Sequence, residues 1–301
     1  MKINKMISVL GAFVLLLTSC ADKVANSYEE AQVEFCAQNP SKCTSGIAEV
    51  SSDLFSSGGI SSSNIGISSV AKSSSQMASS SSLSGYTGTY GSLTDSRDGK
   101  TYKTVIIGTQ TWMAENLNYG TYISDGASSA TLQNGAQKFC YNNIESNCTT
   151  DGGFYQWHTA LALSDTCATK SCSSKIPAGN VQGICPVGWH FPKVTEWNAL
   201  EVYLGGSGVA GSKVKLNNTG NSSWDASAYN RGNPSGFSAL PVGNRSSKGG
   251  FGGRGDYASF GYTTENYGSE MSLRNLGNST SGLFVSGTYK TNGFSVRCVR
   301  D

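Results

Sequence analysis

The sequence predicts an α+β domain with short strands, few helices and long irregular loops, preceded by a disordered linker. Residues 85–301 contain all five tryptophans and many short β-prone runs bounded by glycine. Two stretches of this region have the apolar spacing of a helix. Residues 51–84 contain 17 Ser in 34 positions. Such a segment has too little apolar area to offset the entropy of ordering, so we expect it to be disordered.

Composition excludes several classes of protein. The 301 residues include 22 Lys and Arg against 20 Asp and Glu, a formal charge of +2. This is not the basic excess of a nucleic-acid-binding protein, so no nucleic-acid partner is expected. Gly (37) and Ser (48) are abundant and charged residues make up only 14%, unlike a coiled coil. A single short apolar run at the start argues against a multi-span membrane protein.

Residues 1–19 are predicted to be a signal peptide. Two lysines precede an apolar run from Met6 to Leu17, which is too short for a comfortable membrane span. The run ends at Thr18-Ser19-Cys20, small residues before a cysteine, which resembles a bacterial lipobox. A plain secretory signal with a chance cysteine is the alternative. We expect Cys20 to carry acyl chains that anchor the mature protein at the bacterial outer membrane or cell surface.

Three zones are expected after the signal peptide. Residues 20–50 form a small lipid-anchored segment, which includes a short helix and a Cys36–Cys43 loop. Residues 51–84 are a flexible Ser-rich tether. Residues 85–301 are long enough for one large folded domain.

Local signals place elements within the domain in chain order. Asp98-Gly99 is a strong hairpin signal, and the strand Thr101–Ile107 follows it. Residues 154–163 are expected to form one helix. A second helix is expected from Thr195 as N-cap to Gly205-Gly206, with apolar residues at spacings of three and four. The Gly-rich stretch 249–255 lacks the residues of a phosphate-binding loop, so it is expected to be a surface loop.

The cysteines predict a disulfide framework. There are nine, and assigning Cys20 to the lipid leaves eight, which in an exported chain suggests up to four disulfides among 105 possible pairings. Three pairs are close in sequence, and the two remaining cysteines would join the end of the chain to its middle. No Cys-x2-Cys pair is present, so a metal site is not expected. The favoured pairs are Cys36–Cys43, Cys140–Cys148, Cys167–Cys172 and Cys185–Cys298.

Three blocks carry a family resemblance. They are DSRDGKTYKTVIIGTQTWMAENLNY at 95–119, CPVGWHFPKVTEWNALE at 185–201 and GFSVRCVRD at 293–301. Together they resemble the Fibrobacter succinogenes major paralogous (FISUMP) domain over about 90–301. This resemblance implies an exported bacterial protein, commonly a lipoprotein, and no particular reaction. Family members usually carry Trp-Ser-Ser-Thr where this chain has Gly261-Tyr262-Thr263-Thr264.

A more distant resemblance concerns the fold. GWHFPKVTEWNAL and the terminal Gly-Phe…Arg-Cys are similar to segments of sulfatase-modifying, formylglycine-generating enzymes. This similarity implies a C-type-lectin-like domain, in which two helices flank short twisted sheets and the chain ends meet. A Cys185–Cys298 bridge would suit that closure. The reactive cysteine pair of those enzymes is missing, since Cys298 is the only late cysteine, so oxidase activity is not expected.

The candidate ligand-binding residues are Trp112, Glu115, Asn116 and Trp189. Indole faces suit sugar rings, and a Glu-Asn pair suits the rim of a lectin-like site. The competing interpretations are core packing for both tryptophans, and backbone hydrogen bonding for Glu115 and Asn116.

The function expected from the sequence is non-catalytic binding at the cell surface, of polysaccharide or of envelope proteins. No Gly-x-Ser-x-Gly elbow or paired-carboxylate motif is present, and no cofactor is indicated. Two alternatives stay open. The domain could be an enzyme acting on extracellular glycan with carboxylates from separate loops, or a structural component of the envelope.

Overall fold

The computed structural model describes residues 85–124, 136–216, 223–225, 229–230 and 232–301. The predicted signal peptide 1–19, the acylation site Cys20, the Cys36–Cys43 disulfide and the linker 51–84 lie outside the described residues. Within the described ranges, no helix is both long enough and apolar enough to cross a bilayer.

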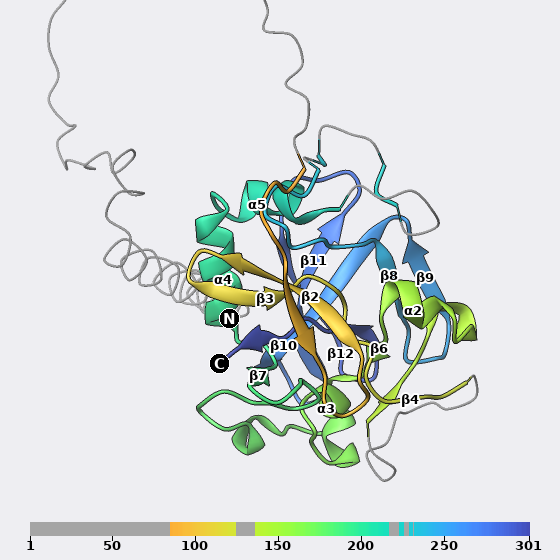
Figure 1. Cartoon of the computed structure of the whole chain (residues 1–301). Helices are drawn as coiled ribbons and strands as arrows, with labels where there is room; N and C mark the ends of the chain where they lie inside the picture. Colours follow the sequence, from red (N-terminus) through yellow and green to blue (C-terminus); the bar gives the residue numbers. More distant parts are fainter. Residues whose placement is uncertain (1–84, 125–135, 217–222, 226–228, 231) are drawn as a thin grey trace, which may run out of the picture.

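The first sheet brings together strands from both ends of the domain (Figure 1). Its order is β1–β2–β3–β14–β7, and every pairing is antiparallel. The β1–β2 hairpin turns through Asp98-Gly99 as expected, with Gly99 at φ +72°. The strands are β1 (Gly91–Thr94), β2 (Thr101–Ile107), β3 (Gln110–Met113), β14 (Val299–Arg300) and β7 (Trp189–His190).

The second sheet is larger and mixed. Its main path is β12–β11–β10–β13–β6, while β8 pairs with β10 and β9 pairs with β8. β4 (Thr121–Tyr122) and β5 (Gln137–Lys138) form a separate parallel pair. The strands of the large sheet are β6 (Phe154–Tyr155), β8 (Val242–Arg245), β9 (Phe251–Arg254), β10 (Tyr257–Glu265), β11 (Glu270–Gly277), β12 (Phe284–Tyr289) and β13 (Phe294–Ser295).

β9 corrects the expectation of a surface loop at 249–255. The strand forms because β8 lies beside it, with Val242 opposite Arg254 and Asn244 opposite Gly252. Gly243 makes the close approach possible. It adopts φ +71°, and an added Cβ there would lie 2.0 Å from the Gly252 oxygen.

The described residues contain four short helices, where the sequence predicted two. They are α2 (Asn147–Asp151), α3 (Trp157–Ala160), α4 (Val194–Tyr203) and α5 (Ser207–Val214). α4 is the second predicted helix, but its N-cap is Lys193 and not Thr195. Glu196, the third residue of the helix, instead accepts the backbone N–H of the N-cap Lys193 through its Oε2 at 2.8 Å. Three 3-10 turns, at 141–143, 165–168 and 173–175, complete the helical content.

The single helix expected at 154–163 is wrong. Phe154 and Tyr155 instead form β6, which pairs with Phe294 and Ser295 of β13. Gln156 stays extended at φ −79°, ψ 154°, and only α3 is helical. The apolar spacing was misleading because Phe154, Tyr155 and the residues of α3 are all buried, so no polar face marks the change of structure.

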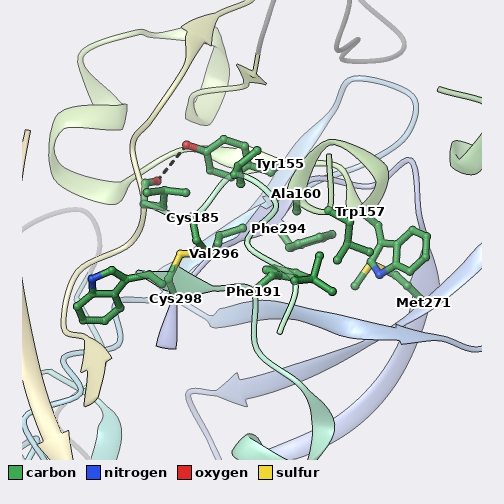
Figure 2. Packing of buried hydrophobic residues seen from close by; sticks show 14 of the residues in the cluster. Tyr155, Trp157, Ala160, Cys185, Phe191, Met271, Phe294, Val296 and Cys298 are labelled. Carbon is green, nitrogen blue, oxygen red and sulfur yellow. Dashed lines mark hydrogen bonds between the residues drawn. A yellow bond between two sulfur atoms is a disulfide. The ribbon is translucent and has the colours of Figure 1, made fainter. Parts of the chain in front are cut away.

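The described residues contain two large apolar cores and a smaller cluster around Phe139, Phe154 and Val242. The first contains the Cys185–Cys298 disulfide at one end and Trp157 at the other, with Phe191 and Phe294 between them (Figure 2). The Trp157 indole N–H donates to the Tyr262 carbonyl at 3.2 Å, so this buried polar atom is satisfied. The second core is aromatic and lies between the first sheet, α4 and β10. Its rings are those of Trp112, Trp197, Phe237 and Phe260.

The described residues contain three of the four expected disulfides, all those whose cysteines they include. Cys140–Cys148 and Cys167–Cys172 close loops with sequence separations of 8 and 5. Cys185–Cys298 spans 113 residues and ties the segment before β7 to the segment before β14. All three therefore stabilise regions with little regular structure.

Candidate functional site

A cleft of about 510 Å³ opens beside the first sheet. Its lining residues include the start of β2, the loop that follows β3, and α2, which forms one wall. The Cys140–Cys148 disulfide anchors α2 and therefore that wall. The residues that line the cleft are Tyr90, Lys100, Thr101, Tyr102, Lys103, Ala114, Glu115, Asn116, Asn118, Cys148, Thr149, Thr150, Gly152, Leu216, Ser238, Leu240 and Arg297.

Asn116 joins the walls of the cleft. It is 7% exposed, and its Nδ2 donates to the Asp151 carbonyl at 2.7 Å and to Ser295 Oγ at 3.4 Å. Its Oδ1 accepts from Nε of Arg297 at 2.6 Å. Gly152 allows the close approach, since an added Cβ there would lie 2.4 Å from the Asn116 Cβ. Asn116 thus lines the cleft and also holds α2 in place.

Arg297 is a buried cation on the inner side of the cleft. It is 1% exposed, and its guanidinium donates to the carbonyls of Met113 (3.0 Å), Phe237 (2.6 Å) and Ser238 (2.8 Å). No carboxylate lies within ion-pair distance of it in the described residues. Burial lowers the pKa of Arg297 to about 9, with Glu115 acting in the opposite direction. The group therefore remains charged at neutral pH.

Other charged side chains also line the cleft. Glu115 is half-buried, and its Oε2 accepts the backbone N–H of Lys103 at 2.7 Å. The Lys103 ammonium lies 5.7 Å from the ring centre of Tyr90. Lys100 forms an ion pair of 2.7 Å with Asp98. The lining residues thus include three cations and one carboxylate, among hydroxyl and amide groups.

The two candidate tryptophans lie in the apolar cores. Trp112 is fully buried in β3, where its ring centre is 4.8 Å from that of Trp197. Trp189 is 6% exposed and packs in the core around Cys185–Cys298. Neither indole has a free face for stacking on a sugar in this structure. Of the predicted ligand-contacting residues, the cleft brings together Glu115 and Asn116.

His190 forms a separate polar cluster. Its Nδ1 lies 2.7 Å from Asp301 Oδ1 and its Nε2 lies 2.6 Å from Glu196 Oε1. Burial disfavours the charged ring, but the two carboxylates outweigh this effect and raise the pKa of His190. His190 is 2% exposed and fixes Asp301 against the start of α4, so its role is structural.

In the described part of the chain, no three His, Cys, Asp or Glu side chains gather as metal ligands would. Asp95 and Asp98 stabilise the β1–β2 turn. Asp95 forms an ion pair of 2.7 Å with Arg97, and both carboxylates accept backbone N–H groups.

Fold and cleft together define a disulfide-stabilised α+β domain with a polar, mainly cationic cleft. The chain matches the Fibrobacter succinogenes major domain (Fib_succ_major) over residues 105–300, and it belongs to this family. No curated protein and no solved structure is significantly similar to it.

Sequence reasoning missed Arg297 as part of the site. The available signal was a charged residue between two apolar ones, since Arg297 lies between Val296 and Cys298 in the block 293–301. The structure buries both of these neighbours. A charged residue enclosed by buried neighbours is unusual enough to suggest a specific role. The contribution of α2 to the cleft had no comparable local signal.

Proposed function

We propose that this protein is an exported surface lipoprotein whose domain binds polysaccharide in the cleft without transforming it. One observation carries the proposal. The cleft brings Glu115 and Asn116 into one cavity with the cations Lys103 and Arg297. A concave site with a few convergent polar groups is the usual form of a small-ligand site.

The charges of the cleft favour an acidic saccharide. Three lining cations face one lining carboxylate, and hydroxyl groups of Thr101, Thr149 and Ser238 offer further hydrogen bonds. Charge-assisted hydrogen bonds to carboxylate groups contribute about twice as much as neutral ones. A glycan that carries carboxylates, such as peptidoglycan with its peptide stems, fits this chemistry better than a neutral polymer does.

The carboxylate inventory favours binding over hydrolysis. Glycoside hydrolysis generally uses two carboxylates that flank the scissile bond. Among the described residues that line the cleft, Glu115 is the only carboxylate. Asp151, on the neighbouring helix α2, is buried and forms an ion pair of 2.7 Å with Arg254.

The C-type-lectin-like fold is supported by the joining of β1 and β14 in one sheet and by the Cys185–Cys298 bridge. Surface anchoring is supported by the lipobox-like Thr18-Ser19-Cys20 sequence. Metabolic labelling of the expressed chain with a fatty acid tests the anchor, since Cys20→Ser should abolish incorporation.

A depletion assay tests the binding function. The oxidised full-length chain is mixed with insoluble peptidoglycan, xylan or cellulose, and the unbound fraction is measured. We expect saturable retention on peptidoglycan. Lys103→Glu should weaken it about tenfold, the effect of one charge-assisted contact, whereas Lys248→Glu, an exposed lysine outside the cleft, should not.

Two outcomes would contradict this proposal. One is absence of retention on every polymer, and the other is retention that Lys103→Glu and Lys248→Glu weaken equally. Release of soluble sugar during the assay, lost in Glu115→Gln, would instead favour the enzymatic alternative.

A further inference from the structure

A second concave site lies on the large sheet, in a different place from the cleft. This sheet groove has a volume of about 390 Å³ and is formed by β8, β10, β11 and β12. It shares no lining residue with the cleft. The strand register explains its floor, because Ser259, Asn275 and Phe284 lie in one row across β10, β11 and β12. Alternation along each strand puts their side chains on the same face.

Two aromatic rings border the groove, and each of them packs against a glycine. The Tyr257 ring packs on Gly253, where an added Cβ would lie 1.8 Å from Cε1. The Phe284 ring packs on Gly282, where an added Cβ would lie 2.5 Å from Cζ. Phe284 is nevertheless 48% exposed, so part of its surface is available to a ligand. The backbone therefore presents these rings in fixed positions, which lowers the entropic cost of binding.

The remaining lining groups are neutral and polar. None of the described residues that line the groove is charged, in contrast to the cleft. The Tyr257 hydroxyl donates to Asn244 Oδ1 at 2.9 Å, which orients that amide at the edge of the groove. Asn275 Nδ2 donates to Ser286 Oγ, while its Oδ1 has no hydrogen-bond donor in the described residues. The terminal torsion of Asn is soft, so a small rotation offers this acceptor to a ligand hydroxyl.

We infer that the sheet groove is a second binding site, and that its ligand is an uncharged saccharide chain. Aromatic rings suit the apolar faces of sugar rings, and amide and hydroxyl groups match sugar hydroxyls as both donors and acceptors. The absence of charge in the lining disfavours an acidic ligand, which would lose its hydration without gaining a counter-charge. The cleft and the groove would then recognise different glycans.

Isothermal titration of the full-length chain with cellohexaose and xylohexaose tests this inference. We expect one of these neutral oligosaccharides to bind and Phe284→Ala to weaken binding about tenfold. Phe284→Tyr keeps the ring and should retain affinity. Tyr267→Ala removes a ring that is 78% exposed outside the groove, and it should have no effect.

The cleft variant Lys103→Glu separates this site from the proposed cleft function. Neutral binding that survives Lys103→Glu and is lost in Phe284→Ala supports the groove, whether or not the cleft binds peptidoglycan. The inference is overturned if neither oligosaccharide binds at millimolar concentration, or if Phe284→Ala and Tyr267→Ala have equal effects. Loss of binding in Lys103→Glu alone would assign the neutral ligand to the cleft.

Discussion

Replacement of Arg297 by methionine should destabilise the domain strongly. The side chain donates to four acceptors in two separate segments, the Met113 carbonyl and Asn116 amide oxygen in one and the carbonyls of Phe237 and Ser238 in the other. Methionine is close in length and keeps the apolar stem, so the change removes mainly the guanidinium and its hydrogen bonds.

The size of the destabilisation depends on which acceptors would be left in the interior without a hydrogen-bond donor. Ser238 and Asn116 line the cleft, where water can replace the lost donor. Met113 and Phe237 do not line it and are at most 1% exposed. An unsatisfied buried acceptor costs about 1–3 kcal/mol, so two cost about 4 kcal/mol. For a domain of this size, this corresponds to a fall in Tm of about 8–16 °C.

Chemical and thermal unfolding, followed by circular dichroism on the oxidised chain, measure this effect. Arg300→Met is the matched control, because Arg300 is exposed on β14 only three residues away. Its effect should stay within about 0.5 kcal/mol. If Arg297→Met is as stable as Arg300→Met, the carbonyl contacts of Arg297 do not stabilise the fold, and the reasoning fails.

Three further predictions concern stability and are measured by the same unfolding assays. Since the pKa of His190 is raised in the folded chain, its protonated form stabilises the fold below pH about 6.5, and this contribution is lost as the pH rises through the raised pKa. His190→Gln should flatten the fall in the free energy of unfolding with rising pH. The same pH profile as that of the unsubstituted chain would contradict this prediction. Replacing Cys185 and Cys298 together by alanine reopens a 113-residue loop and should cost about 5 kcal/mol in the chain-entropy model; a loss below about 1 kcal/mol would refute that. Gly211→Ala places a Cβ 1.9 Å from a backbone oxygen and should cost about 1–3 kcal/mol, whereas Gly208→Ala in the same helix meets no atom within 4 Å and should be harmless. Equal effects of these two changes would contradict the packing argument.

Sequence signals predicted the structure correctly where the backbone conformation depends on residues that are adjacent in the chain. The Asp98-Gly99 turn and the strand Thr101–Ile107 could be predicted, because turn geometry and alternation depend on adjacent residues. Helix α4, stopped just before Gly205-Gly206, was predicted for the same reason, although its N-cap was misplaced by two residues. The cysteine pairs with separations of 8 and 5 were also accessible, since short loops favour closure.

Elements that depend on distant partners were missed. Phe154 and Tyr155 are extended because β13 lies beside them, and 251–254 is a strand because β8 does. α5 contains two glycines, and one of them, Gly211, is required by contact with the distant Gly282. Intrinsic propensity is a weak guide where such contacts decide the backbone conformation.

The sequence by itself determined the family, the α+β composition of the domain, the hairpin at its start and the residues Glu115 and Asn116 as candidates. Only the tertiary structure decided what those residues face. It buried Trp112 and Trp189, brought Arg297 and α2 to the cleft, and formed the groove of the large sheet. The physical reason is that cavities and buried charges arise from packing between segments far apart in the chain, which leaves little signature in local periodicity.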